Sequence, residues 1–262
     1  MSSLRRVSMR VPVCAAELAR ARLLEVAPDG FEERDVDGDM LELGVYVPEV
    51  GVHALLAELP GARVEHAADG WEDAWRAFHR PVVAGGLWLG PPWEPPPDPA
   101  RAVVIDPGRA FGTGAHPTTR LCVELLAATG TRGSLLDLGC GSGILALVAV
   151  RLGFAPVLAV DVDPVAVETT RANARSNGLE VETAILDATT DPLPTADVAV
   201  ANVLLRPVET ILGRLDAHEA ITSGYLAGER PGHDEWAHVE ALELAGWAAD
   251  RFRRSRSATI AL

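Results

Sequence analysis

LLDLGCGSG at residues 135–143, followed by VDVD at residues 160–163, is the stretch of sequence that decides the fold of this chain. The mostly apolar residues 135–138 predict a buried strand, and three glycines spaced as G-x-G-x-G predict a tight turn that leads into a helix. A second apolar run then ends in the acidic residue Asp161. This order of strand, turn, helix and strand is typical of a parallel sheet wrapped by helices.

The glycine turn is suited to holding a ligand. Gly139 and Gly141 have no Cβ, so the backbone can approach a ligand closely, and the helix that follows offers unpaired N–H groups. Asp161 is placed to accept hydrogen bonds from a ribose diol, as acids about 20 residues beyond such a loop do. Dinucleotide-binding loops have their third glycine one position later, where this chain has Ile144. The spacing therefore favours a nucleoside without a pyrophosphate, such as S-adenosylmethionine; the alternative is an ordinary strand–helix turn.

Length and cysteine content limit the class of protein. A chain of 262 residues can form two domains. No stretch approaches the ~18 consecutive apolar residues of a membrane-spanning helix, and the first residues lack the apolar core of a signal peptide. Cys14, Cys122 and Cys140 are far apart and odd in number, which indicates a reducing compartment without a disulfide framework. We therefore expect a cytoplasmic protein with no membrane partner.

Charge and histidine spacing exclude several kinds of site. All 23 basic residues are arginine, so neither a P-loop lysine nor a lysine Schiff base is available. The net charge of −14 opposes nucleic-acid binding and favours a basic partner. His233 and His238 fall in a predicted helix over 232–245, where they point in different directions, so we expect no metal site.

Residues 1–68 predict a small ferredoxin-like α+β domain. The expected order is strand 6–11, helix 15–27, strands 31–36 and 40–47, helix 51–59 and strand 62–66. The pair Asp37-Gly38 predicts a hairpin turn in which both central residues have positive φ. We interpret the domain as a substrate-recognition module, with a merely stabilising extension as the alternative.

Residues 69–100 predict a linker and residues 101–262 a second domain. The linker is rich in tryptophan, and its prolines at 95–97 and 99 favour a semi-rigid extended connector. In the second domain we expect helices over 118–128, 143–152, 164–177, 207–215 and 232–245. Strands are expected over 134–138, 157–161, 180–186, 196–201 and 220–224. The tail, 246–254 and 256–262, predicts a closing antiparallel hairpin.

A second motif, DPGRAFGTGAHPTT at residues 106–119, precedes the glycine turn. Its glycines and proline predict a tight loop that can fold over a ligand and that ends with Thr118 or Thr119 capping a helix. A plain helix cap is the alternative for either threonine. Phe111 either covers the cofactor or fills the core.

Two polar residues follow later strands of the predicted sheet. Asn202 ends the apolar run 196–201, so it should face the same crevice as Gly139 and Asp161. Its neutral carbonyl oxygen can hold an uncharged amine for attack on a sulfonium methyl group, which makes it the catalytic candidate. Asp187 could accept a hydrogen bond from an adenine amino group. The alternative for Asn202 is a residue that only satisfies the backbone of a turn, and the alternative for Asp187 is a solvated acid in a turn.

With these motifs in view, the stretch from Trp71 to Pro207 resembles the family of ribosomal protein L11 methyltransferases. These enzymes methylate the eleventh protein of the large ribosomal subunit with S-adenosylmethionine. The resemblance lies in D-P-G-x-A-F-G-T-G-x-H-P-T-T at 106–119, D-x-G-C-G-S-G-I-L at 137–145, D-x-D-P at 161–164 and A-N-x-L at 201–204. Arg206 departs from it, because the family tends to carry a small residue there, at the mouth of the presumed substrate channel.

The resemblance implies an α/β fold with a Rossmann-like class I methyltransferase domain after the ferredoxin-like domain. It implies that Thr119, Gly139, Asp161 and Asn202 bind the cofactor. The implied activity is methyl transfer to amino groups, on lysine side chains or the N-terminal amine, of the free rather than the ribosome-bound protein. Two alternatives stay open: a methyltransferase acting on another protein or a small amine, and a non-catalytic cofactor-binding module.

Overall fold

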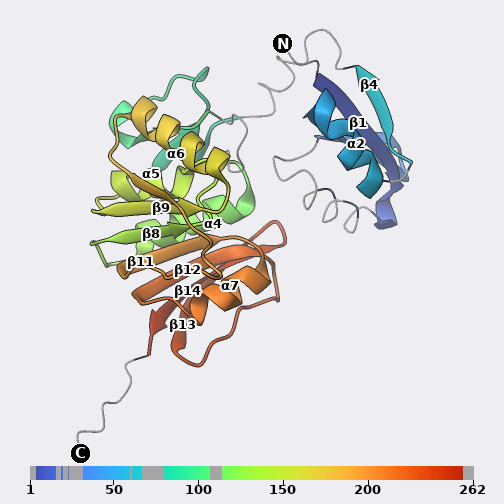
Figure 1. The fold of residues 1–262 in the computed structure, drawn as a ribbon. Helices are drawn as coiled ribbons and strands as arrows, with labels where there is room; N and C mark the ends of the chain where they lie inside the picture. Colours follow the sequence, from blue (N-terminus) through green and yellow to red (C-terminus); the bar gives the residue numbers. More distant parts are fainter. Residues whose placement is uncertain are drawn as a thin grey trace, which may run out of the picture. The chain divides into compact units, whose positions relative to one another are not determined.

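The structure, a computed structural model, describes residues 4–15, 19, 23, 32–59, 61–66, 80–106 and 114–255. The chain divides into two compact units, Met1–Phe78 and His79–Leu262 (Figure 1). Each unit has its own hydrophobic core. Within the described residues, no helix is both long enough and apolar enough to cross a membrane.

The first unit is built on a four-stranded antiparallel sheet. Its elements are β1 (Leu4–Pro12), the 3₁₀ turn η1 (Val13–Ala15), β2 (Glu32–Asp37), β3 (Met40–Pro48), α2 (Glu49–Glu58) and β4 (Arg63–His66). The strand order β2-β3-β1-β4 is that of the predicted ferredoxin-like domain. Alternate residues of β3, Leu41, Leu43 and Val45, point into the core, where Leu55 of α2 also lies. Most of the helix predicted at 15–27 falls outside the described residues.

The predicted hairpin between β2 and β3 is present, but its turn is displaced by one residue. Asp37 pairs with Met40, so Gly38 and Asp39 form the turn rather than Asp37 and Gly38. Neither Gly38 nor Asp39 has a positive φ. A register shift after Asp35 marks a β-bulge, which lengthens β2 by one residue and moves the turn.

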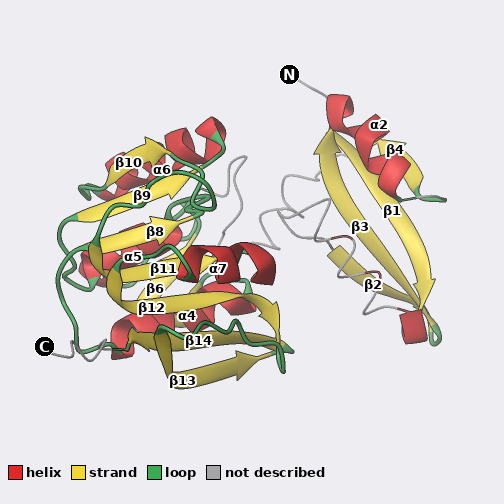
Figure 2. Ribbon diagram, turned by 60° about the horizontal axis from the view of Figure 1, so that its bottom comes forward, coloured by secondary structure: helices red, strands yellow, loops and turns green. Residues whose placement is uncertain are grey.

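The second unit contains a seven-stranded sheet in the order β10-β9-β8-β11-β12-β14-β13 (Figure 2). The strands are β8 (Leu135–Leu138), β9 (Val157–Asp161), β10 (Glu182–Ile185), β11 (Ala196–Asn202), β12 (Ala217–Leu226), β13 (Trp236–Leu244) and β14 (Trp247–Arg254). The first five in the spatial order run parallel, whereas β14 is antiparallel to both of its neighbours. The chain reverses its direction of winding between β8 and β11, which creates a switch point at their carboxyl ends.

Helices cover both faces of this sheet. The core on one face takes side chains from α4 (Pro117–Ala128), α5 (Ile144–Arg151) and α6 (Pro164–Asn177), and the core on the other takes them from α7 (Leu205–Leu212). Local sequence fixes the helix ends. For α6, the Asp163 side chain accepts from the N–H of Val165 at 2.8 Å, Pro164 occupies the first turn, and Gly178 ends the helix at φ 63°.

The predicted helix over 232–245 is wrong, because these residues form strand β13. Strand β13 pairs with β14 across a turn at Ala245 and Gly246, where φ is 50° and 82°. The closing hairpin is therefore present, but it lies one strand earlier than predicted; residues 256–262 fall outside the described residues. Alanine, glutamate and leucine favour a helix, yet the alternating pattern of 236–244 suits an edge strand, and pairing with β14 outweighs local propensity.

The predicted linker is too long at its C-terminal end. Residues 82–104 form a small sheet of β5 (Val82–Ala84), β6 (Leu87–Gly90) and β7 (Ala102–Val104), with the short 3₁₀ helix η2 (Pro99–Arg101) before β7. Ala84, Leu87 and Leu89 are buried in the core of the second unit. The proline run therefore lies in a loop of this unit, because the apolar residues on both sides of it are anchored in the core.

Candidate functional site

The predicted site residues meet at the carboxyl edge of the parallel strands. Leu138, the last residue of β8, pairs with Val160 of β9 and with Ala201 of β11. The next residues on the three strands, Gly139, Asp161 and Asn202, therefore lie abreast at the switch point between β8 and β11. This edge is where open α/β sheets bind their ligands.

The glycine loop is a backbone cradle. Gly139, Gly141 and Gly143 have φ of 80°, 54° and 83°, which residues with a Cβ rarely adopt. A Cβ added to Gly139 would lie 2.5 Å from the side chain of Val203. The N–H groups of Gly139 and Cys140 donate to the carbonyl of Val160 at 2.9 and 3.0 Å. The loop is thus fixed to β9, and its close approach to Val203 requires glycine at position 139.

Asp161 is held by main-chain hydrogen bonds on both carboxylate oxygens. The N–H of Gly141 donates to Oδ2 and the N–H of Asp163 donates to Oδ1, each at 3.0 Å. Each carboxylate oxygen can accept two hydrogen bonds, so both keep capacity for a further donor. The side chain is only partly buried. Its position fits a diol bound against the glycine loop.

Asn202 contacts Thr119, which the sequence places far away. Asn202 Nδ2 donates to Thr119 Oγ1 at 3.4 Å, and Thr119 is buried in the first turn of α4. Because the amide nitrogen points to Thr119, the amide oxygen Oδ1 is the atom left to accept from a ligand. The structure thus brings together Thr119, Gly139, Asp161 and Asn202, with Gly141 beside them.

The cap of α4 differs from the prediction. His116, rather than Thr118 or Thr119, is the N-cap: its Nδ1 accepts from the N–H of Thr118 at 3.4 Å and lies 2.8 Å from the Thr118 hydroxyl. Pro117 occupies the first helical position, which starts the helix one residue before the threonines. Burial lowers the pKa of His116 to about 4, so its ring is neutral at physiological pH. Its ring meets that of Trp247 edge-on, with centroids 5.0 Å apart.

Asp187 makes local hydrogen bonds of its own. Asp187 Oδ1 accepts from the N–H and the hydroxyl of Thr189 at 2.8 and 2.6 Å. These hydrogen bonds hold the pKa of Asp187 below its ordinary value. Asp187 follows β10, whose last residue Ile185 pairs with Asp161, so it lies at the same edge. Phe111 lies outside the described residues.

Sequence reasoning missed the residues that support the loop from behind. Asp137 is fully buried and accepts from the N–H of Ala146 at 3.0 Å, and burial raises its pKa to about 7. Thr170 donates to the Gly141 carbonyl at 3.1 Å and Asn173 to the Ser142 carbonyl at 2.9 Å. Polar residues three apart on one face of a predicted helix were the available signal for this pair.

Gly224 was also missed, although a glycine within a strand often marks a bulge. It has φ of 103°, and the pairing of β12 with β14 shifts register at this residue. A Cβ on Gly224 would overlap the main chain of Val203, the residue after Asn202. The bulge of β12 therefore supports the turn that carries Asn202.

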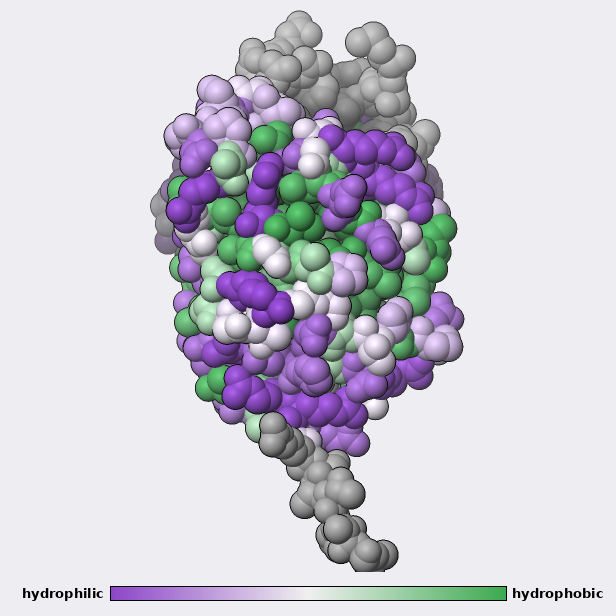
Figure 3. Space-filling view, turned by 90° about the vertical axis from the view of Figure 1, so that its left-hand side faces the viewer, coloured by the Kyte–Doolittle hydropathy of each residue, from purple (hydrophilic) through white to green (hydrophobic). Residues whose placement is uncertain are grey.

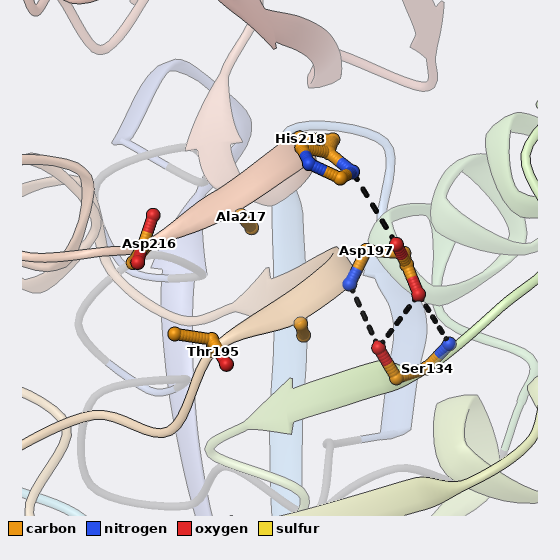
Figure 4. Close-up of a pocket in the computed structure, with 7 residues that line it drawn as sticks. Ser134, Thr195, Asp197, Asp216, Ala217 and His218 are labelled. Atoms are coloured by element: carbon orange, nitrogen blue, oxygen red, sulfur yellow. Dashed lines mark hydrogen bonds and ion pairs between the residues drawn. The ribbon is translucent and has the colours of Figure 1, made fainter.

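A serine, an aspartate and a histidine line a pocket of about 240 Å³ at the opposite edge of the sheet (Figure 4). Ser134 donates to Asp197 Oδ2 from its N–H and its hydroxyl, both at 2.8 Å, which holds the pKa of Asp197 below its ordinary value. His218 contacts the other oxygen, Oδ1, at 3.3 Å. The histidine therefore has no contact with the serine hydroxyl and cannot activate it. The cluster ties the starts of β8, β11 and β12 together.

Neither this edge nor the described residues as a whole offer a metal centre. The amino edge of the parallel strands carries apolar surface in its middle and hydrophilic side chains around it (Figure 3). Among the described residues, no three histidine, cysteine, aspartate or glutamate side chains are grouped to hold a metal ion.

Comparison with known proteins points to one family. The family described as ribosomal protein L11 methyltransferase (PrmA) matches residues 48–230, a range that includes every residue of the carboxyl-edge site. A ribosomal protein L11 methyltransferase of Photorhabdus laumondii is 38% identical over 243 residues, which cover 79% of this chain and 82% of the relative. One of Dechloromonas aromatica is 42% identical over 181 residues, which cover 68% of this chain and 60% of the relative.

A solved structure supports the same fold. The crystal structure of ribosomal protein L11 methylase from Lactobacillus delbrueckii subsp. bulgaricus superposes with a TM-score of 0.58 at 26% sequence identity. The match covers 64% of this chain and 94% of that one. The predicted α/β class, with its mostly parallel sheet and closing antiparallel hairpin, is confirmed.

Proposed function

Because this chain belongs to the ribosomal protein L11 methyltransferase family, we propose that it transfers methyl groups from S-adenosylmethionine to amino groups of ribosomal protein L11. The acceptors are lysine side chains or the N-terminal amine. The observation that carries the proposal is the alignment of Gly139, Asp161 and Asn202 at one sheet edge. This alignment lets a nucleoside on the glycine loop and an amine on Asn202 lie next to each other.

The residues at the edge fit S-adenosylmethionine. Gly139 and Gly141 have positive φ and carry no Cβ, so their backbone can approach a ligand, and Asp161 keeps acceptor capacity for the two ribose hydroxyls. Val162 and Ile185, 65% and 63% exposed at the ends of β9 and β10, offer apolar surface to an adenine ring. Asp187 would accept from the adenine amino group, and Phe111 would cover the ligand.

The residues of this chain promote the transfer by positioning the acceptor amine. S-adenosylmethionine supplies a methyl group on a sulfonium sulfur. Asn202 Oδ1 accepts a hydrogen bond from the amine and directs its lone pair, while Thr119 keeps the amide from rotating. A protonated amine has no lone pair, so the amine must be neutral when it attacks, and the uncharged Asn202 amide can accept its hydrogen bond without adding charge. Water takes the amine proton, since no residue of the described site is placed as a strong base.

The rest of the molecule suits a basic protein acceptor. A net charge of −14 attracts a basic ribosomal protein and opposes approach to ribosomal RNA, so the acceptor is the free protein in the cytoplasm. The ferredoxin-like unit has a core of its own and is the recognition module.

Labelled transfer into a lysate tests the function. The protein is incubated with radiolabelled S-adenosylmethionine and lysate from a strain that lacks the gene, and the labelled band is identified by mass spectrometry. We expect a single main band, ribosomal protein L11. Labelling of a different protein instead would support the second candidate, a methyltransferase with another acceptor. Binding of the cofactor without any labelling would support a non-catalytic module.

A further inference from the structure

Two side chains beside Asn202 have no role in the site described above. Leu204, the N-cap of α7, and Arg206, in the first turn of α7, lie two and four residues beyond Asn202. Leu204 is 66% exposed, and Arg206 is also exposed. Within the described part of the chain, the Arg206 guanidinium makes no hydrogen bond or ion pair; only its main-chain carbonyl accepts, from Thr210. We call this pair the acceptor lip.

The acceptor lip differs in charge from the rest of the edge. Beyond β9 and β10 the edge carries Asp161, Asp163 and Asp187, whose carboxylates accept local hydrogen bonds. On the β11 side, Arg206 supplies a positive charge in a chain whose net charge is −14. Along this edge, carboxylates therefore lie on the side of the cofactor cradle, and a guanidinium lies on the side of the acceptor lip.

The acceptor lip lies close enough to Asn202 to contact the residues that flank the acceptor amine. Four steps of about 3.8 Å place the Cα of Arg206 within about 15 Å of the Cα of Asn202. Leu204 is two residues nearer to Asn202 along the chain. The residues that flank an amine held by Asn202 therefore lie in the neighbourhood of both side chains.

We propose that the acceptor lip selects the amine to be methylated, favouring a lysine that has an aspartate or glutamate beside it. Leu204 packs against the aliphatic stem of the acceptor lysine. Arg206 pairs with the neighbouring carboxylate, for which its planar fork is suited, and repels a basic neighbour. The inference rests on the proposed function and names the substrate class of that same site.

Site mapping on ribosomal protein L11 tests the selection. Purified L11 is incubated with the wild-type protein or with the Arg206→Glu variant, and each reaction is stopped at the same low extent of methylation. Peptide mass spectrometry then gives the fraction of each lysine that is methylated. We expect wild type to favour lysines with a carboxylate within about 8 Å, one Debye length. Arg206→Glu should shift occupancy toward lysines with basic neighbours by about 1.4- to 5-fold, the range of an exposed ion pair.

The matched control is Arg175→Glu. Arg175 is an exposed arginine in the last turn of α6, and the same change of charge there should leave the pattern of methylated lysines as in wild type. An identical pattern for Arg206→Glu and wild type would overturn the proposal. So would a wild-type preference for lysines without acidic neighbours.

A substitution in L11 itself tests the same proposal with wild-type enzyme, and it applies even if Arg206→Glu does not fold. In L11, the acid nearest to the most heavily methylated lysine is replaced by its amide, and wild-type enzyme is used. We expect occupancy at that lysine to fall at least twofold relative to the other sites. Unchanged occupancy would count against selection by charge. Failure of wild type to methylate any L11 would instead overturn the proposed function, so the two outcomes are distinguishable.

Discussion

Asp161 and Asn202 lie on the two strands that flank the strand leading to Gly139, and different contacts orient their side-chain oxygens. Both carboxylate oxygens of Asp161 are already oriented by main-chain N–H groups, whereas Asn202 is oriented through its nitrogen by Thr119. Each side chain therefore presents oriented acceptors to a ligand without needing to reorganise. Acceptors fixed in this way lose little entropy when a ligand binds.

Replacing Asp161 by alanine should weaken cofactor binding. Charge-assisted hydrogen bonds to a diol contribute roughly 1.5–3 kcal/mol, so we expect the dissociation constant for S-adenosylmethionine to rise about ten- to hundredfold. Calorimetric titration measures it. Thr189→Ala serves as the control, because it changes the partner of Asp187 at the same edge and leaves Asp161 untouched. Wild-type affinity in Asp161→Ala would remove this residue from the site.

Asp137 should make stability depend on pH. Its carboxyl has a pKa raised to about 7 by burial, so the folded state binds a proton more tightly than the unfolded state does. The stability from this group is fully present below the unfolded pKa near 4 and is lost as pH rises through 7. Denaturant titrations should show a fall of up to about 4 kcal/mol across this range that is absent from Asp137→Asn. Parallel curves for the two proteins would contradict the assignment.

The turn after β11 depends on an element that is distant in sequence. The bulge of β12 at Gly224 lies against the main chain of Val203, and its neighbour Tyr225 is buried with its hydroxyl 3.0 Å from Asp250 Oδ2 of β14. Strands β12 and β14 thus fix the position of Asn202 through the main chain of Val203.

Gly224→Ala should therefore reduce turnover more than its backbone strain alone explains. Gly228→Ala is the matched control, because Gly228 has a similar φ of 91° but open space around it. A positive φ costs each alanine about 1 kcal/mol. Only Gly224→Ala displaces Val203, and we expect its kcat to fall more than tenfold while Gly228→Ala stays within about threefold of wild type. Equal turnover of the two variants would mean that the bulge does not position Asn202.

Elements with local signals were predictable from the sequence. The run LLDL predicted β8, the G-x-G-x-G turn predicted the glycine loop, and the helix expected over 164–177 matches α6. Strand β13 was not predictable in this way, because its composition favours a helix and its pairing with β14 is tertiary. The contact of Thr119 with Asn202 and the burial of Asp137 likewise depend on the packing of α4 and α5 on the sheet.

The two cores imply that the units can be separated. The core of the second unit includes Ala84, Leu87 and Leu89, so a shortened chain must begin near His79 and not near Ala100. We expect the chain from His79 to bind S-adenosylmethionine with wild-type affinity and to methylate ribosomal protein L11 at least tenfold more slowly. Full-rate methylation by the shortened chain would show that the first unit does not recognise the acceptor. A chain from Ala100 should unfold at a lower temperature.

The most direct test of the central claim is the intact mass of purified ribosomal protein L11 after incubation with S-adenosylmethionine and either wild type or Asn202→Ala. We predict that wild type adds one or more methyl groups to amino nitrogens. We also predict that Asn202→Ala, at saturating cofactor, is at least a hundredfold slower, because the amine loses the acceptor that aligns it. An unmodified L11 with wild type, or equal rates for the two proteins, would contradict the claim that this sheet edge performs the transfer.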